Sequence, residues 1–204
     1  MLVRFPLILV VSPKVPVENY DEFVAWVKEQ PDGAHYASPG AGTPHHLAME
    51  MLRQETNLEL IHVPYRGVTP AIQDIIGGQV PFMFVESGGG IPHIQSGNLK
   101  PIAVASAERM EALPEVPTLR EAGVKDFEAF AWQGISVHVS TPAEEIDRLS
   151  TALQTALNSE AVQTRFRNLG VEAMPGTAAE MDAFVKVERE RWGQLIKAID
   201  LKLD

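Results

Sequence analysis

The residues best placed to do chemistry lie in one short stretch of the chain, which reads SPGAGTPHH from Ser38 to His46. Its glycines permit a tight turn, Thr43 is a good N-cap, and Pro44 suits the first position of a helix. A helix that begins directly after a strand presents free backbone N–H groups and the positive end of its dipole, and both favour an anion. We therefore expect an anion site formed by Ser38, Gly40, Ala41, Gly42 and Thr43. The alternative is a glycine turn that only closes a βα unit.

The type of anion follows from what this stretch lacks. It has neither the Gly-Lys-Ser/Thr ending of a P-loop nor the full glycine spacing of a dinucleotide site, so a small carboxylate suits it better than a nucleotide. Charge-assisted hydrogen bonds and a helix terminus together contribute about 5 kcal/mol, whereas micromolar binding needs about 8 kcal/mol. A second wall must therefore contact the ligand.

Two further segments follow expected strands and should project from the same sheet edge. Tyr65 and Arg66 follow one strand, and Glu86 with Ser87 follows another. We expect Tyr65 to contact the ligand and Glu86 to hold an amine or hydroxyl of it. The alternatives stay open: Tyr65 packs, Arg66 forms a surface ion pair, and Glu86 is a solvated strand end.

Metal and catalytic sites are disfavoured by the same inventory. The six histidines include His46, one helical turn before Glu50, but the second helical histidine of a zinc protease is missing and the chain has no cysteine. A histidine near a helix start is usually a capping or packing residue. Ser87 does not lie in a Gly-x-Ser-x-Gly elbow. We expect no enzyme activity, no metal and no cofactor.

The elements that must position these residues alternate between strands and helices, which predicts a parallel α/β architecture with helices on both sheet faces. Asn19 with Glu22, and Thr177 with Glu180, have capping-box spacing and predict helices to about residues 30 and 199. Further helices are expected at residues 44–55, from Thr69 to the Gly77-Gly78 pair, after the 88–90 glycine cluster to about residue 97, and in two segments over residues 142–169. Strands are expected at residues 7–11, 35–38, 58–63, 79–85, 102–105, 127–132, 134–139 and 171–174.

Composition bounds the class of protein. The chain has 204 residues, 45% of them hydrophobic, which is enough for a sizeable core. Its 17 Lys and Arg residues against 27 Asp and Glu residues give a net charge of -10, which repels phosphate backbones, so nucleic acid is not an expected partner. No apolar run is long enough to span a membrane. Residues 7–11 are too short for a signal peptide and are expected to form a buried strand.

Beyond these local patterns, the order of motifs resembles the Bug receptors, the extracytoplasmic solute-binding proteins of tripartite tricarboxylate transporters. The resemblance covers nearly the whole chain, and its most specific part is PYRG at residues 64–67, followed by Pro70-Ala71, GGQV at residues 77–80, and EAG at residues 121–123. It implies a type II periplasmic-binding-protein-like α/β fold with wound sheets. It also implies a receptor in the periplasm that passes a small carboxylate, such as a di- or tricarboxylate, an aromatic acid or an amino acid, to membrane transporter subunits.

The resemblance also implies a division of the chain. Residues 14–131 would form the complete second lobe, and residues 1–13 and 132–204 would form a crossover strand and the carboxyl-terminal part of the first lobe. The family's anion loop falls on Ser38, Gly40, Ala41, Gly42 and Thr43, in agreement with the helix-terminus argument. Family members carry a signal peptide and the beginning of the first lobe ahead of the point where this sequence starts.

Two departures from the family keep a second function open. The missing part of the first lobe would leave apolar faces uncovered, which favours a non-binding interaction module that dimerises through the exposed first-lobe surfaces. Pro81 and Val85 stand where many relatives have aspartates, which argues against an amino-acid ligand. A hydrolase or metal enzyme is the third alternative.

Overall fold

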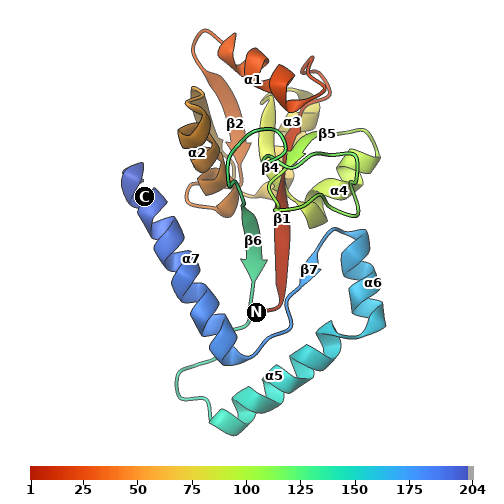
Figure 1. Cartoon of the computed structure of the whole chain (residues 1–204), viewed down its shortest axis with the longest axis vertical. Helices are drawn as coiled ribbons and strands as arrows, with labels where there is room; N and C mark the ends of the chain where they lie inside the picture. The colour runs from red at the N-terminus through yellow and green to blue at the C-terminus, as the bar shows by residue number, and fades with distance from the viewer. Residues whose placement is uncertain (202–204) are drawn as a thin grey trace.

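The computed structural model describes residues 1–201, and within them seven strands and seven helices form an α/β fold (Figure 1). The strands are β1 (Val3–Val11), β2 (Ala34–Ser38), β3 (Leu60–Pro64), β4 (Phe82–Glu86), β5 (Lys100–Val104), β6 (Phe130–Gln133) and β7 (Glu172–Ala173). The helices are α1 (Tyr20–Lys28), α2 (Pro44–Thr56), α3 (Val68–Gly77), α4 (Ser87–Gln95), α5 (Ala143–Leu157), α6 (Glu160–Asn168) and α7 (Ala178–Ala198).

Strand β1 belongs to two sheets. Its carboxyl-terminal half lies between β4 and β5 in the main sheet, whose order is β3-β2-β4-β1-β5. Its amino-terminal half, from Val3 to Pro6, pairs with β6, and Val3 and Arg4 also pair with β7, which together form a short second sheet (Figure 1). The chain after β5 therefore returns to the strand with which it began.

The expectation of a parallel architecture is wrong for β1. All four of its pairings are antiparallel, whereas β2 is parallel to β3 and to β4. The reason is burial: a strand covered on both faces is an unbroken apolar run in either direction, so its residues do not reveal its orientation. The predicted strand also began too late, at residue 7, because Arg4 and Pro6 interrupt the apolar run ahead of it.

The main sheet is covered by helices on both faces, as expected. Leu7 and Leu9 of β1 pack in a cluster with Phe23 of α1 and Leu52 of α2. The alternate residues of β1, such as Ile8, face the opposite cluster, which contains α3 and α4 side chains. Residues 7–11 are fully buried.

Of the two predicted capping boxes, the one at Thr177 is complete, and at Asn19 only the side-chain cap is formed, because the Glu22 carboxylate accepts from the Glu18 amide instead. The Glu22 amide donates to Asn19 Oδ1 over 2.9 Å at the start of α1. At the start of α7, the Glu180 amide donates to Thr177 Oγ1 over 3.2 Å, and the Thr177 amide donates to the Glu180 carboxylate over 2.7 Å. These bonds satisfy amides that the helix itself leaves without acceptors.

Two other expectations need correction. The 88–90 glycines lie inside α4 and not before it. Gly90 lets this helix approach β4 closely, since a Cβ at that position would lie 2.6 Å from Val85 Cγ1. Residues 134–139 are not a strand, since β6 ends at Gln133. They expose Ile135, Val137 and Val139, which have 53%, 43% and 95% of their surface accessible.

Helix α7 connects the two sheets. It begins near the short sheet and runs back alongside α2 (Figure 1). Near its carboxyl-terminal end, Arg191 donates a hydrogen bond to the Glu128 carbonyl, and Trp192 packs against the main core. Over residues 1–201, none of the helices is both long and apolar enough to cross a bilayer.

Candidate functional site

The candidate site is at the carboxyl ends of β2, β3 and β4, where the loop of residues 38–43 joins β2 to α2. This loop, called the 38–43 loop below, turns through Gly42, whose φ of 73° is in the left-handed region that glycine adopts without strain. Thr43 occupies the N-cap position, but its hydroxyl donates to the Gly40 carbonyl over 2.7 Å and does not cap the helix. The amino end of α2 is therefore left without a side-chain cap from Thr43.

Several loop amides are already engaged within the protein. The Gly40 amide donates to Ser38 Oγ over 3.1 Å, and the Gly42 amide donates to His46 Nδ1 over 3.0 Å. The Thr43 amide makes a longer contact of 3.4 Å with the Gly40 carbonyl. These bonds shape the loop and remove those amides from the set of donors for an external anion.

Of the remaining donors, Ala41 belongs to the predicted anion site, whereas His45 and His46 were not predicted to contribute amides. Among the hydrogen bonds of residues 1–201, none begins at the amides of Ala41, His45 or His46. The amides of His45 and His46 lie in the first turn of α2, where a helix leaves its N–H groups unpaired, and Ala41 is exposed at the loop tip. Ser38 is fully buried, so it supports the loop from behind.

Tyr65 lies beside the loop through its backbone. Its amide donates to the Ser38 carbonyl over 2.8 Å, and its own carbonyl is 3.7 Å from the place of a Cβ on Gly40. Its hydroxyl donates to Asp74 Oδ2 over 2.7 Å, and burial together with this bond raises the pKa of Tyr65 to about 12. The ring is thus held against α3. Arg66 is exposed.

Glu86 ends β4 at the same edge and faces α2. Its Oε2 lies 3.0 Å from His45 Nε2, and the His45 side chain is only 4% exposed. Burial alone would raise the pKa of Glu86, but the close approach of the His45 ring outweighs it, so this pKa lies below its ordinary value. The side chain is 27% exposed, which leaves part of it accessible to solvent.

Behind the loop, two imidazole rings stack face to face. The rings of His46 and His62 have centroids 3.9 Å apart and planes 13° apart. His62 Nε2 lies 2.6 Å from Ser38 Oγ. The sequence argument assigned His46 to capping or packing, which its bond to Gly42 confirms, but it missed His62, because His62 reaches the loop from the neighbouring strand.

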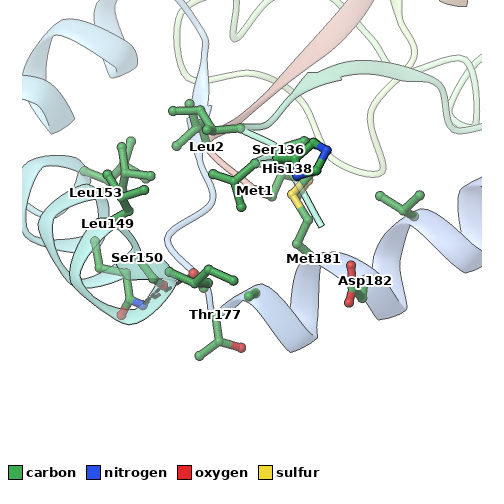
Figure 2. Close-up of a pocket in the computed structure, with 18 of the residues that line it drawn as sticks. Met1, Leu2, Ser136, His138, Leu149, Ser150, Leu153, Thr177, Met181 and Asp182 are labelled. Carbon is green, nitrogen blue, oxygen red and sulfur yellow. Dashed lines mark hydrogen bonds between the residues drawn. The ribbon is translucent and has the colours of Figure 1, made fainter. Parts of the chain in front are cut away.

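A separate cavity of about 550 Å³ lies away from this edge, between α5, α7 and residues 134–139 (Figure 2). In Figure 2, Leu149 and Leu153 of α5 face Met1, Leu2 and Met181 across it. Its lining is mostly apolar, and the 38–43 loop contributes none of it. Within the part of the chain that the structure describes, no group of three or more His, Asp or Glu side chains has the geometry of a metal site.

Comparison with known proteins gives concordant matches. Residues 1–201 match the family model described as tripartite tricarboxylate transporter family receptor. The protein BugT of Bordetella pertussis is 30% identical over 198 residues, which are 97% of this chain and 61% of BugT.

Solved structures share the fold. The Rhodopseudomonas palustris protein Rpa4515, solved with adipate, superposes with a TM-score of 0.92 at 28% identity, over 96% of this chain and 66% of that one. MatC of Rhodopseudomonas palustris, solved with bound malate, gives 0.84 at 28% identity, over 95% and 67%. The chain thus spans about two thirds of each of these two structures.

Proposed function

Since the chain belongs to the tripartite tricarboxylate transporter receptor family, we propose that it binds a small carboxylate reversibly, without turnover, at the amino end of α2. The observation that carries this proposal is that the amides of Ala41, His45 and His46 donate to no acceptor within residues 1–201, at the end of α2 where the helix dipole is positive. Adipate and malate, the ligands of the two structural relatives, are dicarboxylates, and a dicarboxylate is the proposed ligand class.

The roles proposed at this site differ in kind. Ala41 supplies an amide to the ligand, Gly40, Gly42 and Thr43 shape the loop, and Ser38 supports it. Tyr65 contributes its backbone beside Gly40, and Glu86 accepts a hydrogen bond from a hydroxyl or amine of the ligand. The residues that carry the proposal are Ser38, Gly40, Ala41, Gly42, Thr43, Tyr65 and Glu86.

The wider context is part of the same proposal. Residues 14–131 act as the ligand-binding lobe, and the remaining residues as a crossover strand and part of a second lobe. The receptor works in the periplasm and delivers its ligand to membrane transporter subunits, as the family description supports. The matched family is one of receptors and not of enzymes.

A titration of the protein with adipate tests the binding proposal. The loop and helix terminus contribute about 5 kcal/mol, so we expect a dissociation constant of about 0.2 mM by calorimetry. Replacing Ala41 by Asp places a negative charge beside the free amides and should abolish binding, whereas the neutral Ala41→Asn variant should weaken it about threefold or less. Equal affinities for the Asp and Asn variants would contradict an anion site at this loop.

A second candidate function is supported by the apolar cavity of Figure 2. Residues 134–139 pair with no strand among residues 1–201, and their outward apolar side chains adjoin that cavity. A second copy of the chain that lies along this segment would cover Ile135, Val137 and Val139 in both molecules. This would make the protein an interaction module that dimerises, and its test is given in the Discussion.

A further inference from the structure

The stacked histidines hold the 38–43 loop at two separate points. His46 accepts the Gly42 amide over 3.0 Å, near the end of the loop. His62 lies 2.6 Å from Ser38 Oγ, at the start of the loop, and the same oxygen accepts the Gly40 amide. Because the two rings lie 3.9 Å apart, a shift of either one displaces the other.

The direction of the hydrogen bonds fixes the proton on His46. Its Nδ1 accepts the Gly42 N–H, so Nδ1 carries no proton and the single proton of the neutral ring is on Nε2. Nε2 faces Glu50 Oε1 at 4.0 Å. That carboxylate is itself held, since Tyr36 donates to it over 2.8 Å and Arg53 lies 2.7 Å from its other oxygen.

A second proton on His46 is incompatible with this arrangement. An Nδ1–H would face the Gly42 N–H, so two donors would oppose each other and the bond would break. Gly42, whose backbone is in the left-handed region, would lose the acceptor of its amide, and the loop that carries the free amide of Ala41 would lose this restraint. The anion site thus depends on a neutral His46.

We propose that His46 is the positioning residue of the 38–43 loop, stacked on His62, and that its protonation releases the loop and its carboxylate ligand. This inference rests on the proposed function for its ligand but not for its loop geometry. It assigns a positioning role to the side chains of His46 and His62, which lie behind the 38–43 loop.

The surroundings of His46 keep it neutral near pH 7. The groups that face it are His62 from β3, Tyr36 from β2, and Glu50 and Arg53 from its own helix. Burial lowers the pKa of His46, Glu50 opposes this effect and Arg53 adds to it. Burial and the charge of His46 lower the pKa of His62 to about 4. Binding should therefore fall only at a pH lower than that at which an ordinary histidine titrates.

Affinity for adipate at about pH 7.5 and about pH 5 tests the proposal in four proteins: wild type, His46→Asn, His46→Leu and His35→Asn. Asparagine places Oδ1 near the position of Nδ1 and does not titrate, so at neutral pH its affinity should stay within about threefold of wild type. Leucine removes the acceptor and should weaken binding about tenfold. His35 is exposed on β2, and its variant should match wild type at both pH values.

The pH dependence is the decisive comparison. Between the two pH values, wild type should lose about tenfold more affinity than His46→Asn, because the titration of the ligand is common to both. Equal losses would overturn the proposal, as would an unchanged affinity of His46→Leu at neutral pH. In either case the binding function itself would stand.

A measurement without ligand separates the two claims. In nuclear magnetic resonance spectra, the Gly42 amide should be protected from hydrogen exchange at neutral pH and should lose protection together with the titration of the His46 ring. If this occurs and no carboxylate binds, the loop inference holds and the proposed function fails. A Gly42 amide that exchanges independently of His46 would overturn the inference.

Discussion

At the scale of single residues, the loop and the free amide of Ala41 could be predicted, but the engagement of the Gly40, Gly42 and Thr43 amides and the histidine support of the loop could not. Glycines, Thr43 and Pro44 are adjacent in the sequence and directly mark a turn before a helix. His62 is far along the chain from Ser38 and reaches it only because β2 and β3 pair in parallel, with Tyr36 opposite His62. Such a contact depends on strand register, which the sequence alone does not provide.

The lowered pKa of His62 predicts a loss of stability in acid. Above about pH 6.5 the ring is neutral in both the folded and the unfolded chain and contributes no pH dependence. As the pH falls from there towards the folded pKa of about 4, the unfolded chain binds the proton first and is favoured.

Urea denaturation of wild type and His62→Gln checks this prediction. The glutamine amide can hydrogen-bond to Ser38 Oγ as donor or acceptor and does not titrate, so between about pH 6.5 and pH 4 wild type should lose roughly 1 to 3 kcal/mol more of its unfolding free energy than the variant. Parallel stability curves for the two proteins would show that His62 titrates as an ordinary histidine.

At the scale of elements, the order of strands and helices was largely predictable, because apolar runs and capping residues are local signals. The boxes at Asn19 and Thr177 place the starts of α1 and α7 correctly. The antiparallel direction of β1 was missed. A strand buried on both faces is apolar throughout, so it lacks the alternation of apolar and polar residues that is typical of antiparallel sheets with one solvated face. Residues 134–139 have that alternation but find no partner strand among the described residues.

Strand β1 should also dominate stability. Leu9 is fully buried between β4 and β5, so Leu9→Ala should lower the unfolding free energy by about 2 to 5 kcal/mol through lost contacts and a cavity. Val187, 64% exposed on α7, provides the control, and Val187→Ala should change stability by about 0.5 kcal/mol or less. Chemical denaturation of both variants measures the difference, and similar losses would argue against β1 as the centre of the core.

At the scale of the whole molecule, the question is what covers the apolar cavity between α5, α7 and residues 134–139. If a second copy covers it, light scattering should give a dimeric mass for wild type and a monomeric mass for Val137→Lys, because the new charge would be buried in the interface. Val187→Lys, which alters an exposed valine outside the cavity, should stay dimeric. A monomeric wild type would contradict dimerisation through residues 134–139, and the cavity would then be left for a partner other than a second copy.

At this scale, the fold is supported by the match to a family model, whereas the proposed site is supported by the geometry of the 38–43 loop. The family model covers residues 1–201, so the architecture of this chain is that of its relatives. The chain spans about two thirds of the solved relatives and 61% of BugT. The submillimolar affinity expected for adipate counts only the contacts of the 38–43 loop and the amino end of α2.

The shared strand β1 has one more consequence, which concerns insertions and deletions. Successive side chains of a strand point to opposite sides, so adding or removing one residue between Pro6 and Leu7 would rotate everything before that point by half a turn relative to everything after it. Arg4 would then exchange places with a neighbour, and its ion pairs with Glu128 and Glu172 would be lost although neither glutamate had changed. Substitutions in β1 alter packing locally, whereas a change in its length reorients half of the molecule.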